Sequence, residues 1–296
     1  MRNWRRTPSS STDLLPWPRD RRPPARSVRP LLIHPLALLL AALALLPGCA
    51  VLGSDVQHRL DALLPADVLL IGEQHDADAH QRIQQEVVLE LARRGQLAAL
   101  ALEMAQQGQS TRGLAPDASE TAVRAALQWN DGGWPWERYG PVVMAAVRSG
   151  VPVFGANLQR DAMRTAMANT GLDAHLEPAR LEQQRADIRA GHCMLLPESQ
   201  IAPMTRIQIA RDAAMAATVT AAHQPGKTVV LVAGGGHVRR DLGVPTHLMP
   251  TLRARVLLAV AGQPQSGTRG TTDMVWATPA LPPKDHCADL KRQLTR

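Results

Sequence analysis

Three things are scarce in this sequence of 296 residues: long apolar runs, excess charge and aromatic side chains. No apolar run beyond residue 48 reaches the roughly 20 residues that a membrane-spanning helix needs. The chain has a formal charge of +7, but residues 1–30 alone carry +6, so the rest is close to neutral. The basic isoelectric point is therefore no argument for a nucleic-acid partner, and we expect none.

The N-terminus is typical of a secretory leader. Residues 1–30 are basic and interrupted by proline, and residues 31–46 form a mostly apolar run that also contains His34 and Pro35. A charged region followed by an apolar region too short to span a bilayer indicates a signal peptide. We expect this leader to cover residues 1–48.

The leader ends in Leu46-Pro-Gly-Cys49, which resembles the lipobox of bacterial lipoproteins. This resemblance implies that Cys49 carries a lipid and becomes the first residue of the mature protein. Ala50 follows the cysteine where an inner-membrane signal would have aspartate. We therefore expect a lipid-anchored protein of the outer membrane that faces the periplasm; an ordinary signal peptide with a chance cysteine is the alternative.

Cysteine is also scarce, since only Cys193 and Cys287 follow Cys49. An exported protein folds in an oxidising compartment, where thiols tend to pair. Two thiols allow one intramolecular pairing, so we expect a Cys193–Cys287 disulfide. Two separate buried thiols are the alternative.

Short apolar runs alternate with helical stretches over the rest of the chain. The predicted strands are residues 67–71, 97–102, 151–154, 228–232, 255–260 and, more weakly, 274–276. The predicted helices are residues 80–94, 119–128, 139–148, 158–167, 180–189 and 205–222. This alternation predicts an α/β fold with a mixed, largely parallel central sheet, helices on both faces and a helical insertion over 169–205. We expect a linker over 49–66 and one domain over 67–296.

Polar residues stand where several predicted strands end. Gly72-Glu73-Gln74-His75 follows the first strand, Glu103 the second, Asn157 the third and Gly234-Gly-Gly-His237 the fourth. Ligands of open α/β sheets bind beyond the carboxyl ends of the strands. We therefore expect Glu73, His75, Glu103 and His237 to share a pocket, where imidazoles and carboxylates can bind a divalent metal or move protons.

Three nearby features are weaker. Gly234-Gly-Gly is similar to a phosphate loop, but Arg239 stands where the dinucleotide fingerprint requires a third glycine, so that function is excluded. His80 lies on the following helix and either faces the same pocket or is exposed. Asp76 and Asp78 fit the first turn of that helix, where the macrodipole favours carboxylates.

The sole tyrosine, Tyr139, lies near Trp134 and Trp136. Such side chains line cofactor pockets or pack a core, and a phenolate can ligate ferric haem. A packed aromatic cluster is the alternative. Another histidine, His192, adjoins Cys193, a setting in which histidine is more often structural or exposed.

Taken together, these residues resemble the ChaN-type haem-binding uptake lipoproteins of the superfamily that includes Tiki-type proteases and erythromycin esterases. The matching motifs are Gly72-Glu-Gln-His75-Asp76 with His80, Glu103-Met104, Trp136…Tyr139…Pro141, Asn157, Arg211-Asp212…Met215 and Gly236-His237…Asp241. The resemblance implies an α/β fold, an outer-membrane anchor and a role in haem or iron uptake. In that family, haem is held at a dimer interface by a tyrosine, assisted by a histidine of the other subunit.

Transferred to this chain, the resemblance gives ferric haem as cofactor and Tyr139 as the iron ligand. His192 is the first choice for the assisting histidine and His175 the second. Trp136 would cover a porphyrin face and Arg138 would pair with a propionate. The implied partners are haem, a second copy of the chain on haem binding, and an outer-membrane haem receptor.

Two functions remain open at this point. A haem-binding protein without turnover explains the lipobox and the aromatic cluster. A metal-dependent hydrolase, acting on a peptide or an ester through Glu73, His75, Glu103 and His237, explains why two histidines and two carboxylates should converge.

Overall fold

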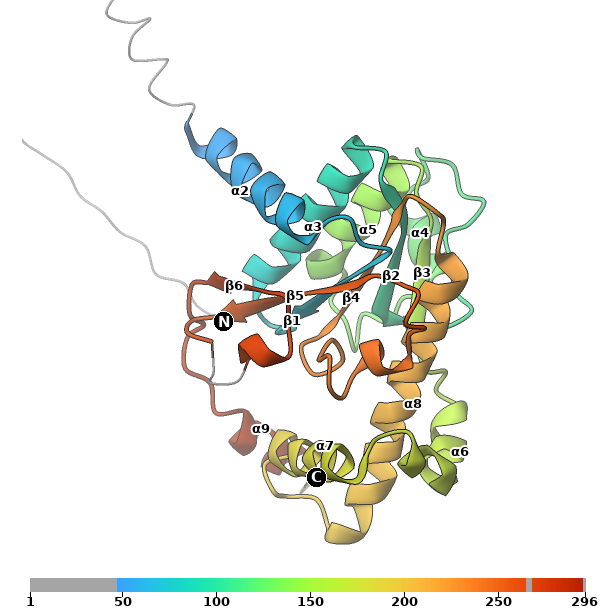
Figure 1. The fold of residues 1–296 in the computed structure, drawn as a ribbon, viewed down its shortest axis with the longest axis vertical. Helices are drawn as coiled ribbons and strands as arrows, with labels where there is room; N and C mark the ends of the chain where they lie inside the picture. The colour runs from blue at the N-terminus through green and yellow to red at the C-terminus, as the bar shows by residue number, and fades with distance from the viewer. Residues whose placement is uncertain (1–46, 265–267, 295–296) are drawn as a thin grey trace, which may run out of the picture. The chain divides into compact units, whose positions relative to one another are not determined.

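The computed structural model describes residues 47–264 and 268–294 (Figure 1). The predicted leader, residues 1–48, therefore lies almost entirely outside the described residues. Among the helices of the described ranges, none has both the length and the apolar character needed to cross a bilayer.

Six strands form one sheet in the order β3-β2-β4-β1-β5-β6, and every pairing between neighbouring strands is parallel. Their bounds are β1 Val68–Glu73, β2 Leu97–Gln106, β3 Val153–Asn157, β4 Thr228–Gly234, β5 Ala254–Ala261 and β6 Met274–Thr278. The predicted α/β fold with a largely parallel sheet is confirmed. Because all strands run in one direction, their carboxyl ends meet at one edge.

Successive side chains of a strand point to opposite faces of the sheet, and both faces are covered here. Leu69 and Ile71 of β1 pack in a large apolar cluster with residues of α2, α3, α4 and α5. Val68 and Leu70 of the same strand pack in a second cluster with residues of α8. Burial on both sides explains why the strands are continuous apolar runs rather than alternating ones.

The helices α3 to α8 correspond to the six predicted helices, whereas α2 and α9 were not predicted. Their bounds are α2 Pro47–Leu63, α3 Asp78–Arg93, α4 Glu120–Ala126, α5 Trp136–Arg148, α6 Ala162–Ala168, α7 Pro178–Gly191, α8 Glu198–Ala222 and α9 His286–Leu294. Short 3₁₀ segments occupy η1 Thr170–Ala174, η2 Val244–His247 and η3 Thr268–Gly270. Four helices, α3, α5, α7 and α8, begin earlier than expected. The helix α5 starts directly after Pro135, and α8 starts at Glu198 and contains Pro203.

The segment expected to be a linker, residues 49–66, is helical as far as Leu63. Val56, Leu60 and Leu63 follow each other at helical spacing, are buried, and belong to the main apolar cluster. These residues pack the helix against the sheet. The prediction of a linker is therefore wrong for residues 49–63. The helix is instead part of the folded domain, as the upper left of Figure 1 shows.

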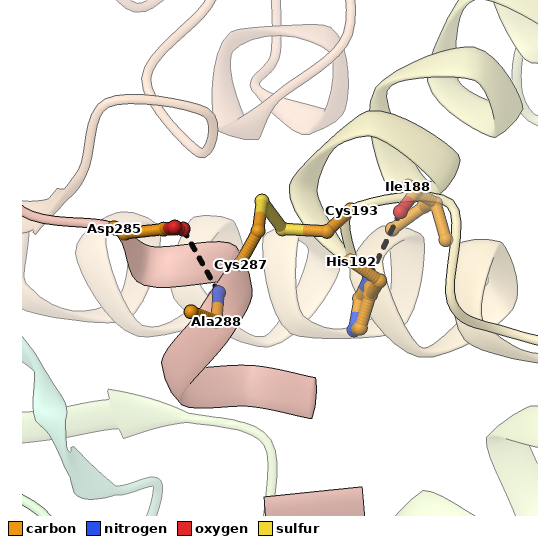
Figure 2. The surroundings of a disulfide bond; sticks show 6 residues. All are labelled: Ile188, His192, Cys193, Asp285, Cys287 and Ala288. Carbon is orange, nitrogen blue, oxygen red and sulfur yellow. Dashed lines mark hydrogen bonds between the residues drawn. A yellow bond between two sulfur atoms is a disulfide. The ribbon is translucent and has the colours of Figure 1, made fainter. Parts of the chain in front are cut away.

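The expected helical insertion is present: between β3 and β4 the described chain is helical, with α6, η1, α7 and the long α8. A small cluster of Leu176, Leu181, Ile209 and Leu242 holds these helices together. Cys193, just beyond α7, forms a disulfide with Cys287 on α9, as predicted, and so joins the C-terminal segment to the insertion (Figure 2).

Candidate functional site

Strand order brings the polar residues at the carboxyl edge together. Strand β4 lies between β1 and β2, so the ends of these three strands are neighbours. Glu73 is the last residue of β1, Glu103 lies near the end of β2, and His237 follows β4. The structure therefore places Glu73, His75, Glu103 and His237 in one cluster.

Glu73 is buried and accepts hydrogen bonds on both carboxylate oxygens. Its Oε1 accepts from the Tyr139 hydroxyl at 2.6 Å and lies 2.7 Å from Nδ1 of His75. Its Oε2 accepts from the Nε2 groups of Gln81, at 2.7 Å, and Gln84. A carboxylate held by four partners is fixed in place, and it stabilises the His75 tautomer that carries its proton on Nδ1.

His75 presents its other ring nitrogen to the site. Nε2 lies 3.9 Å from Oε2 of Glu103, and the side chain is 40% exposed. Burial alone would lower the pKa of His75, but the hydrogen bond to Glu73 and the charge of Glu103 raise it above its usual value. A Cβ at Gly234 would stand 3.0 Å from this nitrogen, so glycine keeps the approach to Nε2 open.

His237 lies between two carboxylates. Its Nδ1 is 2.6 Å from Oδ1 of Asp212, and its Nε2 is 3.4 Å from Oε1 of Glu103. Although burial alone would lower it, the charges of Glu103 and Asp212 raise the pKa of His237 to about 10. Burial opposes ionisation of Glu103, but His237 and His75 bring its pKa down to about 2.

The two histidines, each held by carboxylates, differ in the chemistry they can perform. His75, oriented by Glu73 and accessible at Nε2, can accept or deliver a proton to a bound molecule. His237 is buried, and its protonated ring offsets the charges of Glu103 and Asp212. Burial also raises the pKa of the Asp212 carboxyl to about 6.

The alternative with a divalent metal receives no geometric support. In the parts of the chain that the structure describes, no group of three or more His, Cys, Asp or Glu side chains is arranged to hold a metal ion. The expected metal ligands His75 and His237 instead direct nitrogens toward Glu73, Glu103 and Asp212.

The aromatic cluster is internal. Tyr139 is 1% exposed and Trp136 is 6% exposed, and both belong to the main apolar cluster. Burial, together with the adjacent Glu73 carboxylate, raises the pKa of the Tyr139 phenol well above its usual value. The expectation that Tyr139 ligates iron and that Trp136 covers a porphyrin does not fit this placement, because a ligating phenol must reach the haem and lose its proton. The alternative of a packed aromatic cluster describes these residues better.

Two other expected site residues lie beside the cluster. The Arg138 guanidinium donates to the backbone oxygen of His75 at 3.0 Å and lies 3.3 Å from Asp78, so it is engaged within the domain. His80 is fully buried; its Nδ1 accepts from the Gln74 backbone, and its Nε2 lies 3.1 Å from the Thr278 hydroxyl. His80 therefore holds the turn after β1 against β6 and does not face Glu103.

The two histidines considered for haem lie on the insertion and beside η2. His192 follows the last turn of α7, to one side of the disulfide (Figure 2), and its Nδ1 lies 2.8 Å from the Ile188 oxygen. His175 stacks on His247, with ring centroids 3.6 Å apart, and its Nε2 lies 2.9 Å from the Thr246 hydroxyl. Among the described residues, Nε2 of His192 has no hydrogen-bond partner, whereas Nε2 of His175 contacts Thr246.

Three residues of the cluster had no site role in the sequence analysis: Gln81, Gln84 and Asp212. Two of them interrupt apolar helical stripes. Gln84 is buried on the face of α3 that carries Val87 and Leu91, and Asp212 is buried between Ile209 and Met215 on α8. A polar side chain within an apolar stripe needs a buried partner, and this signal could have identified both residues.

Fold and site define a parallel α/β protein with an acid–histidine cluster at the carboxyl edge of its sheet. The sequence profile of the family described as "Haem-binding uptake, Tiki superfamily, ChaN" matches residues 59–248, more than half of the chain. The chain belongs to this family.

One solved structure has a similar fold. The chain is similar to the structure titled "Cofacial heme binding to ChaN of Campylobacter jejuni", with a TM-score of 0.56 and 24% identity over 71% of this chain and 87% of that one. The type III effector HopBA1 aligns with a TM-score of 0.45 and 14% identity over 76% of this chain and 94% of that one. No curated protein matches the sequence.

Proposed function

We propose that this protein binds ferric haem at the outer membrane, to which a lipid on Cys49 anchors it, and supports haem or iron uptake. Membership of the haem-binding uptake family carries the proposal. The lipobox at Cys49 and the apolar leader support the anchor. A second copy of the chain is the proposed partner on haem binding, and an outer-membrane haem receptor is the proposed source or recipient.

The proposal assigns the iron to His192 rather than to Tyr139. Histidines that bind iron usually donate their other ring N–H to a carbonyl or carboxylate, which fixes the tautomer. His192 has this arrangement, because its Nδ1 lies 2.8 Å from the Ile188 oxygen and Nε2 then carries the free lone pair. His175 remains the second choice, since its Nε2 already contacts Thr246.

Titration of the purified full chain with haemin tests this proposal. We expect saturable binding with a histidine-type absorption spectrum. The His192→Ala variant should bind haemin at least about tenfold more weakly than wild type, because the loss of one ligand bond removes at least 1.4 kcal/mol. His58→Ala is the matched control, since His58 is an exposed histidine on α2. Equal affinity in wild type and His192→Ala would contradict the assignment, and no binding by wild type would contradict the function.

Light scattering of the same samples tests the dimer. Haem exposes a large flat apolar surface, and burial of the second face between two copies removes more of it from water. We expect the mass to double on haemin addition. A monomer at saturating haemin would contradict this part of the proposal.

One observation favours a second candidate function, a hydrolase. Haem storage does not require His75 to be oriented by Glu73 with its Nε2 open toward Glu103 and Gly234. In this candidate, His75 acts as general base: its Nε2 accepts a proton from water, and the resulting hydroxide attacks a peptide or ester carbonyl.

A turnover screen with chromogenic esters and short peptides tests this candidate. His75→Gln removes the base and should reduce turnover by a factor on the order of 10²–10⁴. The exposed His58→Ala variant serves again as the control. Turnover that is equal in wild type and His75→Gln would exclude His75 as the base.

A further inference from the structure

A cavity of about 450 Å³ adjoins the acid–histidine cluster. Its wall includes Glu103, Trp134, Asn157, Arg160 and Arg211. Glu103 and Trp134 both contact His75, through a nitrogen–oxygen distance of 3.9 Å and an edge-on ring contact at 4.7 Å. The cavity therefore opens beside the accessible nitrogen of His75.

The two arginines of this wall make no side-chain hydrogen bond or ion pair within residues 47–264 and 268–294. The charge of Arg211 acts on the adjacent Asp212 carboxyl, whose Oδ1 contacts His237 instead. The Nε of Arg211 is buried and has no acceptor. A buried guanidinium N–H without an acceptor is costly, so its persistence requires an explanation such as a ligand.

The Glu103 carboxylate, which also lines the cavity, does not pair with these arginines. Glu103 is occupied by His237 at 3.4 Å, His75 at 3.9 Å and the Gly234 backbone N–H at 2.7 Å. Other arginines of the domain surface pair with Asp or Glu, as Arg206 does with Asp173 and Arg239 with Asp187. The cavity wall therefore contains two guanidinium groups that no carboxylate of the described residues contacts.

A neutral acceptor completes the lining. The Asn157 amide donates from Nδ2 to the Glu103 backbone oxygen at 2.9 Å, and its Oδ1 is buried with no donor within the described chain. An incoming molecule with a hydroxyl or N–H group would satisfy this oxygen. The Trp134 ring supplies apolar area on the same wall.

We infer that this cavity binds a small molecule that carries an oxyanion, a carboxylate or a phosphate, which Arg160 and Arg211 hold at one end. A guanidinium matches the two oxygens of either group with parallel hydrogen bonds. The rest of the molecule lies along Trp134 toward Asn157 and His75. The inference goes beyond haem binding and needs no turnover, so it holds or fails separately from both proposed functions.

Calorimetric titration of the full chain with succinate and with inorganic phosphate tests the site, and glycerol is the neutral probe. We expect binding of at least one anion, no binding of glycerol, and affinity that falls as ionic strength rises. Arg160→Gln and Arg211→Gln should each weaken anion binding about tenfold, the scale of a charge-assisted hydrogen bond. Arg211→Lys, which keeps the charge but not the paired donors, should fall between wild type and Arg211→Gln.

Arg164→Gln is the matched control, because Arg164 is an exposed arginine of α6 that does not line the cavity. Arg160 is exposed, so Arg160→Gln tests the site even if Arg211→Gln does not fold. Anion binding that is absent from wild type, or equal in wild type, Arg160→Gln and Arg164→Gln, would overturn the inference.

Haemin titration of Arg160→Gln identifies the source of the oxyanion. Unchanged haemin affinity together with weakened succinate or phosphate binding would assign the cavity to a separate small ligand. A parallel loss of haemin and succinate affinity would assign it to a haem propionate, which has the same carboxylate chemistry. Both results support an oxyanion site at the two arginines.

Discussion

The Tyr139 hydroxyl donates a hydrogen bond of 2.6 Å to Oε1 of Glu73, the same oxygen that contacts Nδ1 of His75 at 2.7 Å. Tyr139 comes from α5, which packs against α3, and Glu73 ends the central strand β1. The sole tyrosine is thus a support of the acid–histidine cluster, and its position links the helical layer to the site.

The Tyr139→Phe substitution should destabilise the protein. It keeps the ring in the apolar cluster but removes one of four donors to the buried Glu73 carboxylate. Hydrogen bonds to charged groups contribute about 1.5–3 kcal/mol, so we expect a loss of that size in the free energy of unfolding. Urea denaturation measures it. An unchanged midpoint and slope would mean that the hydroxyl does not bond to Glu73 in solution.

Stability should fall as the pH rises through the alkaline range. The pKa of His237 is about 10 in the folded protein, against about 6.5 when unfolded. Below pH 6.5 both states hold the proton and its contribution is fully present; between about 6.5 and 10 only the folded state binds it, so stability declines with pH.

Asp212→Asn separates His237 from other groups that titrate in this range. Asp212 is one of the two carboxylates that raise the pKa of His237, so its neutralisation should move the alkaline decline to lower pH. Thermal unfolding between pH 6.5 and 10 measures the decline, and NMR titration of the imidazole assigns it. The same pH profile in wild type and Asp212→Asn would contradict this account of the cluster.

The disulfide should contribute substantially to stability. Cys193 and Cys287 are 94 positions apart in the sequence, and for a loop of this length the chain-entropy model gives about 4–5 kcal/mol. We expect Cys193→Ser, Cys287→Ser and the double variant to lose similar amounts, because each of them removes the same bond. Denaturant midpoints under non-reducing conditions are the measurement, and two free thiols in the unreduced, unfolded wild type would rule the bond out.

The proposed membrane anchor is a lipid on Cys49. We expect Cys49→Ser to move the protein from the membrane fraction to the soluble periplasmic fraction, since the lipid can no longer be attached. Cys287→Ser is the control, as it removes a cysteine without touching the lipobox. If Cys49→Ser remains with membranes at high salt, something other than a lipid on this residue holds it there.

Much of the fold could be predicted from the sequence because its determinants are local. Each strand is an apolar run buried on both faces, as Val68–Glu73 shows, and such runs are visible without tertiary information. The helix α2 was missed because its buried residues Val56, Leu60 and Leu63 are separated mostly by polar residues. Only their contact with the sheet shows that the segment is not a linker.

The site was predictable to the extent that parallel strands bring their ends together. Glu73 and Glu103 could be grouped because each stands at the end of an apolar run. The burial of the Tyr139 side chain could not be predicted. A sole tyrosine next to tryptophans is compatible with a haem pocket as well as with a packed core. Packing of α5 on α3 decides between these, and that contact is not encoded in any local pattern.

The most direct test of the account is the absorption and electron paramagnetic resonance spectrum of the haemin complex in three forms of the chain: wild type, Tyr139→Phe and His192→Ala. The free Nε2 of His192 and the buried, protonated phenol of Tyr139 predict that Tyr139→Phe has the wild-type, histidine-type spectrum and that His192→Ala loses it. A tyrosinate-type spectrum in wild type that disappears in Tyr139→Phe and persists in His192→Ala would contradict the account.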